Sequence, residues 1–154
     1  MEYAVGKAGR IIAARLFEGE SLYESIESIA EKEDIKAAAV LITGGIRKAS
    51  VVVGPKTETP KIVAEFHPFT GPGEAFGVGT LYCDEDNKPK LHLHAGLGKL
   101  NESPMVGCPR GGASVFLILE ITIIEILGID AKRITDPQTG FKLLQIKKII
   151  TEKK

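Results

Sequence analysis

This chain is poor in the features that mark secreted, membrane-spanning and nucleic-acid-coating proteins. It has only two cysteines, Cys83 and Cys108, which excludes a disulfide-dense scaffold and favours free thiols or metal ligands over a disulfide. No apolar run reaches the ~18–20 residues of a membrane span, because the longest run, residues 115–127, is interrupted by polar side chains. The first residues lack the basic and then apolar layout of a signal peptide. We therefore expect a cytoplasmic protein.

An excess of charge of either sign is also missing. The 20 basic and 20 acidic residues give a formal net charge of zero. Proteins that bind DNA without sequence preference usually carry a basic excess, because neutralising phosphates supplies most of their affinity. Balanced charge argues against DNA binding but leaves room for a local basic patch. The lysines of residues 147–154 read as a solvated end rather than a nucleic-acid contact.

What is present suits one folded domain. The chain has 154 residues, of which 44% are hydrophobic and 26% charged, close to the average soluble composition. It contains no repeat, low-complexity tract or linker. We expect a single domain over residues 1–154 with its core at about residues 9–146.

One helix has a clear sequence pattern. Ser21 and Glu24 have the spacing of a capping box, in which a hydroxyl at the N-cap is followed three residues later by a carboxylate. Apolar residues then recur at helical spacing, at Leu22, Ile26, Ile29 and Ala30. This pattern predicts an amphipathic helix of about three turns.

Most of the remaining chain has sequence patterns typical of β-strands. Strands are expected over residues 9–17, 37–43 (interrupted by Gly44-Gly45 and resuming over 47–53), 61–66, 77–83, 90–97, 114–127, 133–135 and 141–146. The segments between them, including residues 54–60, 68–73, 84–89 and the glycine-rich 106–112, are expected as loops. Together these elements predict an α+β domain: a mostly antiparallel sheet of about seven to eight strands with one main helix packed on it.

The strongest chemical lead is a His-x-His pair. Successive side chains of a strand alternate between faces, so His92 and His94 share one face while Leu91, Leu93 and Ala95 point the other way. Downstream, the 106–112 loop presents the thiol of Cys108. Imidazole and thiolate are preferred ligands of zinc. The sequence therefore predicts a metal site, most simply zinc, formed by His92, His94 and Cys108.

The spacing of the hairpin suggests room beside these histidines. If residues 84–89 form the hairpin loop, Leu81 pairs with His92 and Gly79 with His94. Two glycines of that strand would then lie on the histidine face and leave space for an ion, a water or a ligand. A slip of one residue would reverse this arrangement.

Several alternatives stay open for the site. Three ligands leave a fourth tetrahedral position free, as in catalytic zinc sites, whereas Cys83 or His67 could close the site and make it structural. Glu74 and Glu120 could accept a hydrogen bond from an imidazole or form ordinary salt bridges. The plainest alternative is that the histidines only hydrogen-bond to each other within a half-buried sheet.

Several motifs, taken in order, resemble those of the PPC (plants and prokaryotes conserved) domain family. They are Arg15-Leu16-x-x-Gly19-Glu20, Gly44-Gly45-Ile46-Arg47, Gly77-Val78-Gly79-Thr80, His92-Leu93-His94-Ala95, Gly107-Cys108, Glu120 and Asp136-x-x-Thr139-Gly140. The resemblance covers nearly the whole chain. At Cys108 this chain departs from the family, which often has histidine there.

The resemblance implies a domain that assembles as a homotrimer and is described as DNA-binding in prokaryotes. The DNA-binding AT-hook that accompanies the domain in plants is missing here. The function expected first is thus a stand-alone, DNA-associated regulatory trimer with a His/Cys metal site. The alternative is a small zinc-dependent enzyme or small-molecule-binding protein that uses His92, His94 and Cys108. A third reading is an assembly module with structural histidines.

Overall fold

Strands make up most of this fold. The structure, a computed structural model, describes residues 1–57 and 62–147. The elements are β1 (Lys7–Phe17), α1 (Leu22–Lys32), β2 (Ala37–Thr57), β3 (Val63–Cys83), β4 (Pro89–Gly98), β5 (Met105–Leu127), β6 (Ala131–Thr135) and β7 (Lys142–Ile146). One helix and seven strands in these residues confirm the predicted α+β class.

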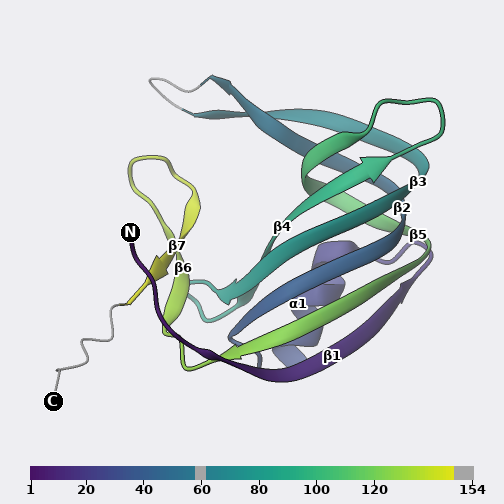
Figure 1. Cartoon of the computed structure of the whole chain (residues 1–154). Coiled ribbons are helices and arrows are strands. Elements are labelled where there is room, and N and C mark those ends of the chain that lie inside the picture. The colour runs from purple at the N-terminus through teal and green to yellow at the C-terminus, as the bar shows by residue number, and fades with distance from the viewer. Residues whose placement is uncertain (58–61, 148–154) are drawn as a thin grey trace, which may run out of the picture.

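The main sheet is antiparallel and bends until it meets itself (Figure 1). Its strand order is β1-β5-β2-β3-β4, and β5 pairs with β4 as well as with β1 and β2. Strands β2, β3, β4 and β5 therefore form a closed ring of pairings. The first part of β5 pairs with β4 and the far end of β2, and its last part lies between β2 and β1.

A bulge between β2 and β5 lets the sheet curl. The pairing shifts register between Gly44 opposite Leu119 and Ile46 opposite Val115. Leu117 in the extra stretch has a φ of 57° and Gly44 has a φ of 138°. A Cβ atom at Gly44 would lie 2.6 Å from the carbonyl oxygen of Ile118, so only glycine permits this approach.

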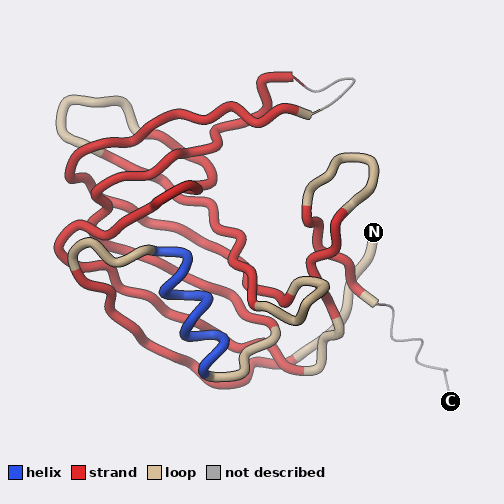
Figure 2. The backbone as a smooth tube through the Cα atoms, turned by 180° about the vertical axis from the view of Figure 1, so that it is seen from behind, coloured by secondary structure: helices blue, strands red, loops and turns tan. Residues whose placement is uncertain are grey.

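Helix α1 covers one face of the curled sheet (Figure 2). Its buried residues are Leu22, Ile26 and Ala30, three of the four apolar positions that the helical spacing predicts; the fourth, Ile29, is partly buried and packs against the core. Ser21 is the N-cap, but its side chain makes no capping hydrogen bond. Its backbone instead forms an isolated bridge with Ser114 of β5, so the predicted capping box does not form. Among the described residues no helix is long and apolar enough to cross a membrane.

The strands run longer than the sequence predicts. Glycine and proline at residues 44–46 and 68–73 do not end strands, because bulges absorb these residues within one continuous pairing of β2 with β3, from Ala37 opposite Tyr82 to Thr57 opposite Val63. The expected loops at 68–73 and 106–112 are therefore wrong, since both segments lie inside strands. The loop expected at 54–60 is wrong for residues 54–57, which belong to β2, and residues 63–66 of the strand expected at 61–66 lie in β3. Residues 58–61 lie outside the described part of the chain.

The opposite face of the sheet is apolar and exposed. Residues directly opposite one another share a face, and the register sets Leu41 opposite Val78 and Val78 opposite His94. Leu41 is 42% exposed, Val78 63% and Phe76, two residues before Val78, 71%. We name Leu41, Phe76 and Val78 the outer patch. The predicted histidine ligands lie at the edge of this patch.

Candidate metal centre

Strand β4 presents both histidines on one side, as its alternation predicts. Leu91, Leu93 and Ala95 point into the core and are almost fully buried. His94 is exposed and His92 is partly buried on the other face. The apolar residues thus fix the strand and leave the imidazoles free to meet a third ligand.

Cys108 reaches the histidines from the neighbouring strand rather than from a loop. Ala95 lies opposite Gly107, so the antiparallel register brings Cys108 level with His94. A Cβ atom at Gly107 would lie 2.2 Å from the carbonyl oxygen of Val52, so glycine is required for β5 to approach β2 there. This close approach holds the Cys108 side chain, which is buried.

The three candidate ligand atoms converge. The Nε2 atoms of His92 and His94 are 3.2 Å apart, and the Cys108 Sγ atom is 3.6 Å from His92 Nε2. All three atoms lie within 4.8 Å of one another. Around a tetrahedral zinc ion with its usual Zn–N and Zn–S bond lengths, ligand atoms lie roughly 3.3–3.6 Å apart. The two printed separations are close to this range, and the third, between His94 and Cys108, is at most 4.8 Å, so the donor set is of the kind that holds a tetrahedral ion such as zinc.

Burial and neighbouring positive charges favour the neutral form of one imidazole. Burial lowers the pKa of His92, and the positive charges of Arg133, His94 and Arg110 lower it further. A lowered pKa means that His92 is neutral at pH 7, which is the form that coordinates a metal.

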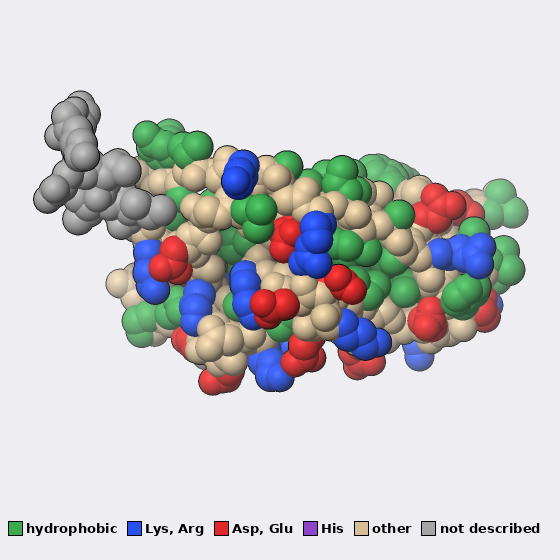
Figure 3. All heavy atoms as spheres, turned by 90° about the horizontal axis from the view of Figure 1, so that it is seen from below, with side chains coloured by type: hydrophobic (Ala, Val, Ile, Leu, Met, Phe, Trp, Pro, Cys, Tyr) green, Lys and Arg blue, Asp and Glu red, His purple; other side chains and the backbone are tan. Residues whose placement is uncertain are grey.

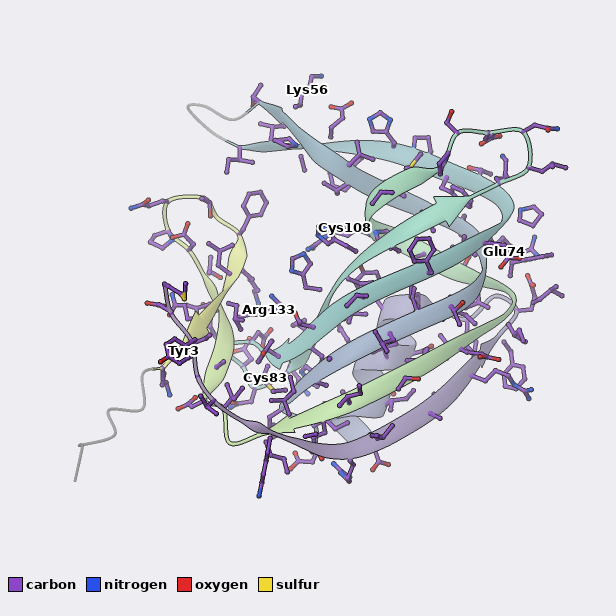
Figure 4. All side chains as sticks on the ribbon, viewed as in Figure 1. Tyr3, Lys56, Glu74, Cys83, Cys108 and Arg133 are labelled. Carbon is purple, nitrogen blue, oxygen red and sulfur yellow. The ribbon has the colours of Figure 1, made fainter. Side chains whose placement is uncertain are left out.

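The cluster lies where two cavities adjoin. His92 lines a cavity of about 670 Å³ beside Tyr23, Arg110 and Arg133. His94 and Cys108 line a second cavity of about 570 Å³, and Arg110 borders both. In Figure 4, Arg133 of β6 is labelled beside the β6–β7 hairpin, and Cys108 lies on the sheet between this hairpin and Glu74. A metal bound here would be within reach of small molecules.

The predicted pairing beside the histidines is wrong by one residue. Thr80 lies opposite His92 and Val78 opposite His94, whereas Gly77 and Gly79 face the core. The turn is shorter than expected because the Asp84 carboxylate accepts hydrogen bonds from the backbone N–H groups of Asp86 and Lys88, 3.0 Å each. Strand β4 then starts at Pro89, opposite Cys83. The space beside the histidines is bordered by Thr80 and Val78, not by glycines.

A family model named the Plants and Prokaryotes Conserved (PCC) domain matches residues 3–127. The chain belongs to this family. It is the PPC family that the sequence motifs resemble, so that prediction is confirmed. The match includes His92, His94 and Cys108.

Solved structures share the PPC fold over nearly the whole chain. A metal-containing protein from Archaeoglobus fulgidus is 25% identical, with a TM-score of 0.79 over 94% of this chain and 99% of that one. A PPC protein from Pyrococcus horikoshii is 23% identical, with a TM-score of 0.80 over 97% and 100%. A candidate DNA-binding protein from Bacteroides thetaiotaomicron is 14% identical, with a TM-score of 0.73 over 91% and 96%. No functionally curated protein is significantly similar to this chain.

The other residues considered from the sequence do not join the cluster. Within residues 1–57 and 62–147, His92, His94 and Cys108 are the one group of three or more His, Cys, Asp or Glu side chains placed to hold an ion. Cys83 is a buried free thiol, and His67 lies 4.0 Å from Glu65. Glu74 lies at the far edge of the sheet from Cys108 (Figure 4), and Glu120 is exposed on β5. Neither carboxylate is hydrogen-bonded to an imidazole in the described structure.

No sequence motif indicates two further residues of the cavity, Arg133 and Tyr23. Arg133 comes from the short strand β6, where alternation places Ala131 and Arg133 on the buried side. That alternation is the one signal that could have revealed it. Tyr23 follows the helix N-cap, and its hydroxyl is buried without a hydrogen-bond partner among the described residues. Nothing in the local sequence indicates this.

Proposed function

We propose that this PPC-domain protein binds one zinc ion per chain through His92, His94 and Cys108. The observation that supports this is the spacing of the donor atoms, 3.2 Å between the imidazole nitrogens and 3.6 Å between sulfur and nitrogen. The metal-containing relative from Archaeoglobus fulgidus adds support from the same fold.

Three protein ligands leave one coordination position for water or substrate. Such a site is typical of catalytic zinc, whereas structural zinc has four protein ligands. Bound zinc supplies a Lewis acid and lowers the pKa of a coordinated water. The adjoining cavities of about 670 and 570 Å³ give a small molecule access to it. We therefore favour the metal-dependent enzyme or small-molecule-binding protein over a purely structural role.

Metal content and a spectroscopic signature test this proposal. The purified full chain should hold about one zinc per chain after dialysis, measured by elemental analysis. Replacing zinc with cobalt should give a thiolate-to-cobalt charge-transfer band, because sulfur is a ligand. Cys108→Ser should abolish this band, and Cys83→Ser, which changes the other buried thiol, should preserve it. Protein without bound metal, or a band that disappears with Cys83→Ser instead, would refute the assignment.

We further propose that the chain forms a homotrimer through the outer patch. Leu41, Phe76 and Val78 lie together on an uncovered sheet face and are 42%, 71% and 63% exposed. Apolar sheet faces of this kind are commonly buried by association. Because His94 lies in the same cross-strand row as Leu41 and Val78, the trimer contact would run close to the metal centre.

DNA association is the second candidate function. It is favoured by fold relatives named as candidate DNA-binding proteins. Charge argues against a strong contact: the net charge is zero, and on the face shown in Figure 3 basic and acidic side chains are interspersed. We propose that any DNA binding is weak and mainly electrostatic.

A further inference from the structure

One arginine beside the candidate metal centre is buried without an acidic partner. Arg133 is 6% exposed. Its guanidinium donates to the Thr80 carbonyl and hydroxyl oxygens at 3.0 and 2.9 Å and to the Lys90 carbonyl oxygen at 3.3 Å. These acceptors are neutral, and no carboxylate of the described residues forms an ion pair with it. Buried charges are normally neutralised by a partner, so this guanidinium points to an external anion.

A second arginine faces the same space. Arg110 lines the 670 Å³ cavity together with Arg133 and His92. It forms neither an ion pair nor a hydrogen bond with the described residues. Its charge, like that of Arg133, lowers the pKa of His92, which indicates that all three groups lie near one another.

The remaining charges of the cavity do not neutralise these arginines. Lys90 is paired with Glu27 at 2.9 Å, and Lys142 with the buried Asp84 at 3.1 Å. Glu24, the other acidic residue of the lining, is exposed at the cavity rim. The lining of the cavity thus carries an excess of positive charge.

We propose that Arg110 and Arg133 form an oxyanion subsite next to the metal centre, which binds a small molecule through a carboxylate or phosphate group. The proposal rests on the proposed metal function and names its ligand class. Guanidinium groups donate paired hydrogen bonds that match the oxygens of such anions. A cavity of about 670 Å³ has the size of pockets that take small organic molecules.

The burial of Arg133 favours a small molecule over a nucleic-acid backbone. Phosphates of a duplex are neutralised by exposed basic side chains along its length. A side chain that is 6% exposed and lines a cavity is poorly placed to meet the backbone of a duplex. A small anion can enter and contact both arginines.

Calorimetric titration of the zinc-loaded full chain tests the subsite. Inorganic phosphate and acetate are the two probes, and acetamide is the uncharged control. At least one of the two anions should bind saturably, and the tighter one identifies the ligand group. Arg110→Gln should weaken binding by roughly 10-fold or more, because it removes a charged hydrogen-bond donor. Arg110→Lys, which keeps the charge, should restore part of the affinity.

Arg15→Gln is the matched control, because Arg15 lies on β1 with its guanidinium over Phe17. It should leave anion binding unchanged. Zinc is quantified in every sample, so loss of the metal function is seen directly as missing zinc. Zinc-loaded protein that binds neither anion, or that binds one equally well with Arg110→Gln, would overturn the subsite while leaving the metal centre intact.

Discussion

Replacing His94 by alanine should separate metal binding from folding. His94 is exposed, and its neighbours Leu93 and Ala95 supply the buried contacts of β4. Exposed substitutions away from special contacts usually change the free energy of unfolding by less than about 0.5 kcal/mol. Metal-free His94→Ala should therefore be as stable as the metal-free parent protein.

The expected loss of zinc affinity is large compared with this small change in the free energy of unfolding. Structural zinc sites with four ligands bind with about 10–16 kcal/mol at neutral pH, or roughly 3 kcal/mol per ligand. Each 1.4 kcal/mol is tenfold, so losing one imidazole of three should weaken zinc binding by about 100-fold or more. His92 is partly buried and its Nε2 atom also contacts the Cys108 Sγ atom at 3.6 Å, so we expect it to keep its position without its neighbour.

Competition with a chromophoric chelator measures this change, and circular dichroism melting measures stability. His67→Ala is the matched control, because His67 is the third histidine, is exposed and lies outside the cluster. It should bind zinc like the parent protein. Equal zinc affinity in the two variants would refute the ligand assignment, and unfolding of His94→Ala would show that the histidine pair is structural.

Four further outcomes are expected. Sedimentation equilibrium should give three times the chain mass of 16.5 kDa, and a monomeric parent protein would refute the trimer. Val78→Asp in the outer patch should give a monomer, since it places a charge on a face that association buries. Random and AT-rich duplexes should bind weakly, with an affinity that falls steeply with salt, and salt-insensitive submicromolar binding would contradict this. Tyr23→Phe should raise the free energy of unfolding by about 1 kcal/mol, because it removes a buried hydroxyl without a partner; a clear decrease in denaturant titration would show that the hydroxyl is bonded. Zinc affinity measured by equilibrium dialysis should fall as the pH falls, because protons compete for the imidazoles. Burial, and then the charge of Arg133, lower the pKa of His92, so its share of this loss should begin below about pH 6.5. Affinity that does not change with pH would contradict histidine ligation.

Much of the fold is predictable because its signals are local. The helix follows from the apolar spacing of Leu22, Ile26 and Ala30, all of which are buried. The alternation of β4 is likewise visible in the sequence and correct. Strand ends are not predictable in the same way, because residues 44–46 and 68–73 look like breaks but are held in the sheet by pairing along β2 and β3. That pairing is a long-range property.

The candidate site is likewise only partly predictable from the sequence. His92, His94 and Cys108 are recognisable from their residue types and spacing, and the structure brings them together. The register beside them is not, because the Asp84 carboxylate shortens the turn by bonding to its backbone. Arg133 is missed because it comes from a separate hairpin whose position over Thr80 depends on tertiary packing.

The β4–β5 pairing has a consequence for the order in which the molecule assembles. Only 16 positions separate His92 from Cys108, whereas Arg10 on β1 and Glu125 on β5, which bond to each other, are 115 positions apart. Closing a short loop costs less conformational entropy than closing a long one, and distant pairings dominate the folding time of β-rich chains. The donor set can thus come together in a hairpin while the ends of the sheet are still unpaired. A zinc ion bound to these residues would then stabilise the partly folded chain before β1 pairs with β5.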